Sequence, residues 1–355
     1  MISATTATTT TISKLRLGII TSLFTTLSLV GCSQPESTVS AETTTASAET
    51  DKPAKTLAIT QIVEHPSLDE MRRGIQDELA DNGYVAGENL DINFQSAQGN
   101  TGTAGQIAKQ FVGDVPDAIV AISTPSAQSI VASTTSIPVI YTAVSDPVAA
   151  KLINEQNVPI QDNVTGLSSQ LPLEPQIELI KKIKPDAKTV GYVYSPGEAN
   201  SVALLKRLQE VLPSYGLKVL DVSANRPTDI AMATRSLQGR ADIIYTSMDN
   251  NVASAFEAMT AAANELQIPI IASDEFSVQR GATAALGVND YDFGRTTGKM
   301  VYRILNGEAV VNVKPEIMNT LTLFVSPKNA AAQGVKLSDA LLTDAINVDE
   351  KPKAK

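Results

Sequence analysis

The chain has 355 residues, a formal net charge of -10 at pH 7 and 43% hydrophobic residues, so it can form two domains with their own cores. Its acidity argues against a nucleic-acid surface, which needs clustered Lys and Arg, and its single Cys and single His exclude an internal disulfide and a multi-histidine or cysteine-based metal site. With 4% aromatic residues and no Trp, a stacking platform is also disfavoured. The composition favours a binding protein that uses no metal and no cofactor.

Residues 1–31 have the pattern of a secretory signal. Lys14 and Arg16 precede an apolar run at 17–30 that is too short to cross a membrane comfortably. The run ends at Cys32 in a sequence that resembles the bacterial lipobox, in which cleavage before the cysteine exposes it for lipid attachment. We therefore expect an extracytoplasmic protein anchored to the membrane by lipid at Cys32, on the periplasmic side in a diderm host.

Residues 32–55 consist mostly of Ser, Thr, Ala, Glu and Pro. Such a composition buries too little apolar surface to offset the entropy of ordering the chain. We expect a flexible tether here, with folding starting near Thr56.

From Thr56 onward, short apolar runs alternate with helical patterns, which predicts an α/β fold of parallel sheets covered by helices. The first helix carries a capping-box signature, Ser67 with Glu70 three residues later, and ends at Asn82. In the first half we expect strands at 57–63, 90–94, 117–122 and 137–141, and helices at 67–82, 106–112 and from 123. In the second half we expect strands at 189–194, 217–222, 242–245, 269–271 and 283–288, and helices at 200–212 and 252–266. Two similar halves in an exported protein suggest two lobes with a ligand cleft between them.

Several short motifs, in order along the chain, resemble the ABC transporter substrate-binding lipoprotein family, which includes binders of tryptophan, tyrosine and phenylalanine. These motifs are Ile59–Pro66, Ala121–Gln128, Tyr141–Pro147, Asn163–Gly166 and Asp249–Asn250. The resemblance implies a type I periplasmic-binding-protein fold, in which two Rossmann-like lobes are joined by a three-segment hinge.

The resemblance also implies a division of the chain between the lobes. Lobe one is expected to contain residues 56–148 plus 276–308, including the strand at 283–288. Lobe two is expected to contain residues 149–275 plus 309–348.

Ligands of open α/β sheets lie beyond the carboxyl ends of the strands, so the loops there supply the candidate site. The expected ligand-binding residues are His65, Ser123, Thr124, Ser126, Gln128, Ala143, Ser145, Asp249, Asn250 and Asp274. The Ser123–Ser126 segment starts a helix with Pro125 in its first turn, which leaves amide donors and the positive end of the helix dipole for a ligand carboxylate. By itself this segment also fits an ordinary helix cap, and the family resemblance favours the binding role.

An amino-acid ligand also needs an acceptor for its ammonium group. Asp249 is the first candidate because Asn250 stands beside it, and Asp274 is the second. Each Asp could instead be a helix cap or a turn former. His65 has no nucleophile near it in sequence, so we expect it to form part of the cleft wall and assign no catalytic residue.

The leading hypothesis is capture of a small, amino-acid-like ligand through closure of two lobes, and the resemblance implies an aromatic amino acid. The ligand would pass to an ABC permease with a separate ATPase, since the chain has no phosphate-binding G-x-x-x-x-G-K-[ST] motif, and the protein is expected to be a monomer. One alternative is a lipoprotein sensor that signals ligand occupancy to a membrane receptor. Another is a carboxylate-dependent enzyme on the same fold.

Overall fold

The computed structural model describes residues 52–318 and 320–350. The predicted signal peptide 1–31, the predicted lipidation at Cys32 and residues 33–51 of the predicted tether lie outside these ranges. The first strand starts at Lys55, one residue before the predicted start of folding. Within the described ranges, no helix is both long enough and apolar enough to span a bilayer.

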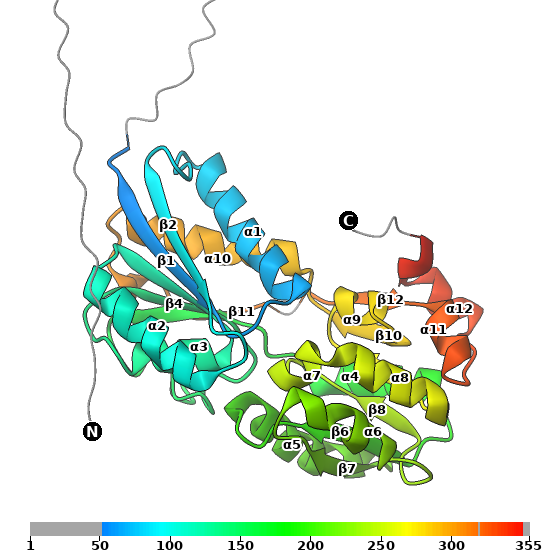
Figure 1. Ribbon diagram of the computed structural model, residues 1–355. Coiled ribbons are helices and arrows are strands. Elements are labelled where there is room, and N and C mark those ends of the chain that lie inside the picture. Colours follow the sequence, from blue (N-terminus) through cyan, green and yellow to red (C-terminus); the bar gives the residue numbers. More distant parts are fainter. Residues whose placement is uncertain (1–51, 319, 351–355) are drawn as a thin grey trace, which may run out of the picture. The chain divides into compact units, whose positions relative to one another are not determined.

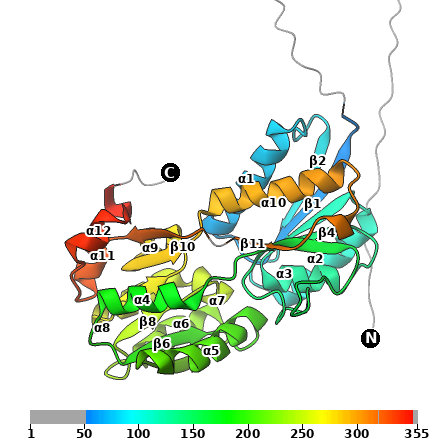
Figure 2. The same ribbon diagram turned by 180° about the vertical axis from the view of Figure 1, so that it is seen from behind.

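The first sheet has, within the described residues, six parallel strands in the order β11-β5-β4-β3-β1-β2 (Figure 1). Its strands are β1 (Lys55–Gln61), β2 (Leu90–Ser96), β3 (Ala118–Ile122), β4 (Val139–Val144), β5 (Val164–Ser168) and β11 (Glu316–Ile317). Helices α1 (Pro66–Asp81) and α10 (Asp290–Leu305) lie on one face, and α2 (Thr101–Asp114) and α3 (Thr124–Val131) lie on the other (Figures 1 and 2). Strands β3 and β4 are buried along their whole length, as expected for central strands covered on both faces.

The second sheet has seven described strands in the order β13-β12-β10-β9-β8-β6-β7, with β12 antiparallel to β10 and the other neighbours parallel. Its strands are β6 (Thr189–Tyr194), β7 (Lys218–Ser223), β8 (Ile243–Tyr245), β9 (Ile270–Ala272), β10 (Ala284–Gly287), β12 (Thr322–Val325) and β13 (Ile346–Asn347). Its helices are α4 (Leu173–Ile183), α5 (Ala199–Val211), α6 (Ile230–Arg235), α7 (Asn250–Ser254), α8 (Phe256–Leu266), α9 (Glu275–Gln279), α11 (Pro327–Ala332) and α12 (Asp339–Thr343). Short 3-10 helices η1 (Leu212–Tyr215), η2 (Pro227–Asp229), η3 (Val310–Asn312) and η4 (Val348–Glu350) complete the described elements.

The second sheet separates two apolar cores, because side chains along a strand point alternately to its two faces. In β8, Ile243 and Tyr245 enter the core formed with α4, α5 and α12, whereas Ile244 enters the core formed with α6, α8 and α9. The residues of β8 are buried throughout, so the strand has no polar face to show its register in the sequence.

The route of the chain between the sheets differs from the predicted one at three strands. Strand β10 was assigned to lobe one, but it lies in the second sheet, where Ala284 pairs with Ile271 of β9 in parallel register. Strands β5 and β11 lie in the first sheet, where Val164 pairs with Val139, although their residues were assigned to lobe two. Backbone pairing over long sequence separations decides the sheet to which a short apolar strand belongs, and no local pattern reports it.

Two helices also differ from their predicted form. The N-cap of α1 is His65, whose Nδ1 accepts a hydrogen bond of 3.2 Å from the Ser67 amide, so the capping-box prediction for Ser67 was wrong. The predicted helix at 252–266 is divided at Ala255 into α7 and α8, and α7 starts two residues earlier. Both differences lie beside the candidate site.

Helices α1 and α10 are far apart in sequence but pack side by side through glycines (Figures 1 and 2). A Cβ added to Gly294 would approach the carbonyl of Met71, and one added to Gly74 would approach the carbonyl of Tyr291, both closer than 3.0 Å. A Cβ added to Gly298 would meet the side chain of Glu78 in the same way. Any larger residue would therefore push the two helices apart.

We predict that Gly294→Ala destabilises the protein by about 1–3 kcal/mol, because the added methyl group has to displace backbone atoms of α1. Urea denaturation gives the free energy of unfolding. The matched control is Gly105→Ala in α2, where an added Cβ meets nothing within 4 Å and alanine should be neutral or stabilising. Equal stability of the two variants would contradict the close packing of α1 and α10.

Candidate ligand-binding site

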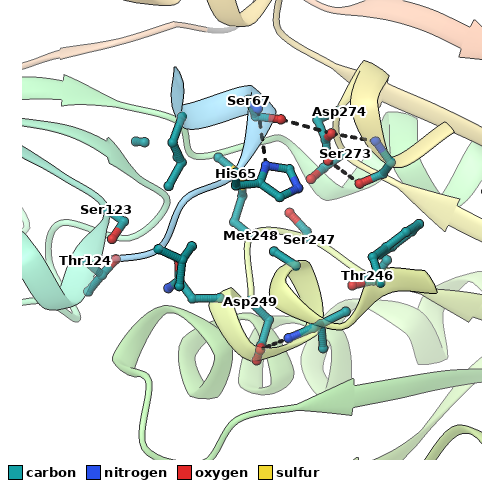
Figure 3. A pocket seen from close by; sticks show the side chains of 18 residues that line it. His65, Ser67, Ser123, Thr124, Thr246, Ser247, Met248, Asp249, Ser273 and Asp274 are labelled. Carbon is teal, nitrogen blue, oxygen red and sulfur yellow. Dashed lines mark hydrogen bonds between the residues drawn. The ribbon is translucent and has the colours of Figure 1, made fainter. Parts of the chain in front are cut away.

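A cavity of about 590 Å³, counting the space open to solvent, lies where loops of both sheets meet (Figure 3). Its walls come from the last residues of β4 and from segments that follow β1, β3, β8 and β9, at the carboxyl ends of these strands. The lining residues are Val63, His65, Ser67, Leu68, Ser123, Thr124, Ala143, Thr246, Ser247, Met248, Asp249, Asn250, Val252, Ala253, Phe256, Ser273, Asp274 and Ser277. The cavity is therefore placed where a ligand of an open α/β sheet is expected.

Most of the residues expected from the sequence lie in this cavity. Those that line it are His65, Ser123, Thr124, Ala143, Asp249, Asn250 and Asp274. Ser126 is fully buried behind the helix start, and the side-chain amide of Gln128 donates to the carbonyl of Ala150, so neither residue lines the cavity. Ser145 lines a different, smaller cavity with Asp146 and Tyr245.

The start of α3 presents polar groups to the cavity. Ser123 is the N-cap of this helix but makes no side-chain capping bond, unlike the N-cap residues of α1, α2, α7 and α9. Within the described chain, the buried hydroxyls of Ser123 and Ser126 have no hydrogen-bond partner. The amides of Thr124 and Ser126 have no helical carbonyl four residues before them. These donors lie at the positive end of the helix dipole.

Three residues that line the cavity have a backbone conformation that side chains disfavour. Ser123 has φ 78° and ψ 160°, a region that is normally occupied by glycine, and Ala143 and Met248 have φ values of 53° and 51°. Strain of this kind costs about 1–3 kcal/mol per residue and persists where the surrounding structure imposes it, typically at functional sites. The strained backbone marks the same cavity independently of its side chains.

Asp249 faces the cavity wall but its carboxylate is already fully occupied. It accepts hydrogen bonds from the Ser195 amide at 2.7 Å, the Ser195 hydroxyl at 2.8 Å, the Ser201 hydroxyl at 2.7 Å and the Val252 amide at 3.0 Å. These four bonds match the approximately four lone-pair positions of a carboxylate. Asp249 therefore caps α7 and holds three chain segments together, and the structure does not support its prediction as the ammonium acceptor.

Glu198 is a buried carboxyl group that the sequence analysis did not single out. Its Oε2 accepts from the side-chain amide of Asn250 at 2.6 Å and from the Asn250 backbone amide at 3.2 Å. The pKa of Glu198 is raised to about 7, mainly by burial and secondly by the negative charge of Asp249. Its place in the predicted loop between β6 and α5 was the only signal in the sequence. Glu198 orients Asn250, which lines the cavity.

Asp274 has a different arrangement from Asp249. Its Oδ1 accepts from the Ser277 amide at 2.8 Å and from the Ser67 hydroxyl at 3.1 Å, while its Oδ2 accepts from the Ser277 hydroxyl at 2.6 Å (Figure 3). Three bonds leave one lone-pair position of Oδ2 available by count. Ser67 comes after β1 of the first sheet, and Asp274 comes after β9 of the second sheet. Their hydrogen bond therefore crosses the cavity.

His65 makes a second contact across the cavity. Its Nε2 lies 2.6 Å from Nη1 of Arg280, which follows α9, and Arg280 also forms a two-bond ion pair with Glu257. Burial lowers the pKa of His65 below its usual value; the charge of Asp274 opposes this shift and that of Arg280 adds to it. His65 is thus part of the cavity wall, as predicted, and it also joins elements of the two sheets.

The apolar wall of the cavity was not predicted as part of the site. Val63, Leu68, Met248, Val252 and Phe256 line it together with the polar residues. In the sequence, Leu68 and Phe256 have the helical spacing of core residues, and no pattern separates a side chain that packs in a core from one that faces a ligand. Among the described residues there is no group of three or more His, Cys, Asp or Glu side chains that could hold a metal ion.

Two sheets with helices on both faces and a polar cavity at the carboxyl ends of their strands define the type I periplasmic-binding-protein fold. The chain belongs to the family of ABC transporter substrate-binding proteins, whose model matches residues 56–349. It is 35% identical over 327 residues to a tyrosine-binding protein of Clostridioides difficile, a match that covers 92% of this chain and 94% of the relative.

Solved structures extend this result. A conserved domain protein from Vibrio cholerae is 41% identical with a TM-score of 0.80. A domain from Streptococcus pneumoniae in complex with L-Trp is 31% identical with a TM-score of 0.79. A substrate-binding protein from Clostridium difficile in a ligand-free, open structure is 37% identical with a TM-score of 0.64. Each match covers 83% of this chain and 99% of the solved chain.

We predict that Asp249→Ala lowers the free energy of unfolding by about 2–4 kcal/mol, because it leaves the buried donors of Ser195, Ser201 and Val252 without their acceptor. Thermal and urea denaturation of the ligand-free protein measure the loss. The control is Asp146→Ala, which removes one hydrogen bond, to the Ala149 amide, and should cost less. An unchanged melting temperature for Asp249→Ala would contradict the role of Asp249 in holding this loop.

We also predict that Glu198 makes the protein less stable as the pH rises. Its folded pKa of about 7 lies above the ordinary value, so its contribution to stability is complete below pH 4.5 and is lost as the pH rises through 7. The free energy of unfolding of Glu198→Gln, relative to that of wild type, should therefore increase as the pH rises from 5 to 8. The total increase should be on the order of 3 kcal/mol. Urea denaturation across this pH range measures the difference, and Glu210→Gln on the exposed side of α5 is the control. A difference that does not change with pH would contradict the raised pKa.

Proposed function

We propose that this protein captures a free amino acid with an apolar or aromatic side chain for an ABC importer. The observation that carries the proposal is the uncapped start of α3, with the unpartnered hydroxyl of Ser123, in a cavity that both sheets line. Among the described residues there are candidate partners for the two charged groups of the ligand and for its apolar side chain, and contacts that would hold the lobes closed.

The start of α3 suits the ligand carboxylate. The Thr124 amide and the Ser123 hydroxyl can donate to it, and the helix dipole favours its charge without a full positive charge nearby. An anion bound there also supplies the missing partner of the Ser123 hydroxyl, whose buried state is otherwise unfavourable.

Asp274 suits the ligand ammonium, in place of Asp249. It is buried at the cavity wall and retains a lone-pair position on Oδ2. The unpartnered hydroxyl of Ser273, next to it in the chain, is a second acceptor in the cavity. A cation between these two groups would be held by a charged hydrogen bond in a region with little water.

The ligand side chain suits the apolar wall. Leu68 comes from the first sheet's helices, whereas Met248 and Phe256 come from the second sheet's loops and helices. An aromatic ring placed among them would bury a large apolar area and gain edge or face contacts with Phe256. The relatives named for tyrosine and crystallised with L-Trp support an aromatic amino acid as the ligand.

Ligand capture is proposed to work by closure of the two lobes around the cavity. The TM-score is higher to the L-Trp complex than to the ligand-free open structure, although the open structure is more similar in sequence. This order supports the interpretation that the described arrangement is the closed one. The Ser67–Asp274 bond across the cavity is consistent with it.

The last step of the proposed function is delivery of the ligand to the permease. The protein is proposed to be a monomer outside the cytoplasm, held at the membrane by lipid on Cys32, and to present the closed form to a permease whose ATPase is a separate chain. Family membership supports the transporter partner. The anchor rests on the sequence pattern around Cys32.

Calorimetry with L-tyrosine and two altered ligands tests both charged ends. Asp274→Asn should weaken L-tyrosine binding at least thirtyfold, because loss of one partner of a desolvated charge pair costs about 2–5 kcal/mol. It should change the affinity of 3-(4-hydroxyphenyl)propionate, which has no ammonium group, much less. Ser123→Ala should weaken L-tyrosine about tenfold or more, and affect tyramine, which has no carboxylate, much less.

Ser67→Ala is the matched control for Asp274→Asn, because it removes the hydrogen bond across the cavity and keeps the Asp274 charge. If Asp274→Asn weakens both ligands equally, Asp274 is not the ammonium acceptor. If native mass spectrometry and calorimetry find no binding of any free aromatic amino acid, the proposed function is wrong.

A further inference from the structure

His65 has a hydrogen-bonding arrangement that no single protonation state satisfies. Its Nδ1 lies 3.2 Å from the amide nitrogen of Ser67, and its Nε2 lies 2.6 Å from Nη1 of Arg280. Both neighbours only donate hydrogen bonds. A neutral imidazole can accept from one of them, and a protonated imidazole can accept from neither. A proton added to His65 would therefore break the remaining favourable contact and place two cations side by side.

The contact between His65 and Arg280 joins the two sheets. His65 follows β1 of the first sheet, and Arg280 lies between α9 and β10 of the second. Both side chains are largely buried, so the ring and the guanidinium meet in a region with little solvent to screen them. Separation of the lobes would end this contact, whereas the Nδ1 contact within the α1 cap can remain.

Charged groups from three helices surround the ring. Asp274 at the start of α9 and Asp69 in α1 favour a protonated ring, as does Glu257 in α8, while Arg280 disfavours it. The Glu257 carboxylate is engaged by Arg280 through two bonds of 2.7 Å. Asp290 in α10 lies near Ser67, and burial raises its pKa well above the usual range, so it brings little negative charge. Burial and Arg280 outweigh the acids, and the pKa of His65 is lowered.

We propose that His65 and Arg280 form a proton-sensitive latch across the ligand cavity, so that the closed form requires neutral His65 and acidification releases the ligand. This inference rests on the proposed function, in which closure retains an amino acid. Because the open form binds the proton more tightly than the closed form, the dissociation constant rises as the pH falls below the usual pKa of histidine. Because binding is linked to a single proton, the dissociation constant can rise at most tenfold per pH unit.

The test uses the fact that His65 is the only histidine in the chain, so one ring resonance follows its protonation without ambiguity. We expect its NMR titration midpoint to be lower in the protein saturated with L-tyrosine than in the ligand-free protein. We expect the dissociation constant of L-tyrosine, measured by calorimetry, to rise several-fold to tenfold per unit between pH 6.5 and 5. Over this range the ionisation of free tyrosine does not change.

Two variants separate the latch from other causes of pH dependence. His65→Asn keeps a side-chain cap for α1 but cannot titrate, so its dissociation constant should be nearly independent of pH, whatever its affinity at pH 8. Arg280→Gln removes the neighbouring cation and should raise the titration midpoint of His65 in the protein saturated with L-tyrosine. Glu198→Gln is the control, because Glu198 is another buried group with a pKa near neutrality. The dissociation constant of this variant should rise between pH 6.5 and 5 as steeply as that of wild type.

The outcomes distinguish this inference from the proposed function. If wild type binds L-tyrosine at pH 8 but His65→Asn follows the same pH profile, or the His65 midpoint is unchanged by ligand, the latch is wrong and ligand capture stands. If no aromatic amino acid binds at pH 8, the proposed function is wrong. The latch, which acts on the release of that ligand, is then overturned with it.

Discussion

In a parallel sheet, all strands end at the same edge, and the candidate binding site of this protein depends on that constraint. Each crossover helix returns the chain to the opposite edge, so the end of β4 and the segments after β1, β3, β8 and β9 are the parts that can meet around one cavity. The close packing of α1 with α10 (Asp290–Leu305) then holds a late part of the chain against the first sheet. Polar groups at the strand ends can therefore come from distant parts of the sequence and still surround one ligand.

Much of the fold could be predicted from the sequence because the individual strands and helices have strong local signals. The buried runs of β3 and β4 and the apolar face of α1 are examples. The sheet membership of β5, β10 and β11 could not be predicted, since these short strands are placed by partners far away in sequence. Ser67 was misread for a similar reason: its hydroxyl bonds Asp274 across the cavity, and His65 caps the helix instead.

The candidate site shows the same division between local and distant information. The position of a residue after a strand was enough to predict that Ser123, Asp249 and Asp274 would lie at the cavity. Their roles depended on hydrogen bonds that the sequence does not report, which made Asp249 a structural carboxylate and left an acceptor position on Asp274. The apolar side chains of the wall carry no signal at all, because a ligand and a core select the same residue types.

The four hydrogen bonds to Asp249 have a consequence for the thermodynamics of binding. They fix the loop that carries Met248 and Asn250 when the protein folds, so this wall of the cavity is preorganised before a ligand arrives. The conformational entropy of that loop is then lost during folding and does not count against affinity. Ligands that differ in their side chains should consequently contact the same rigid surface. Differences in their affinity would then come from shape complementarity and desolvation, with little contribution from loop rearrangement.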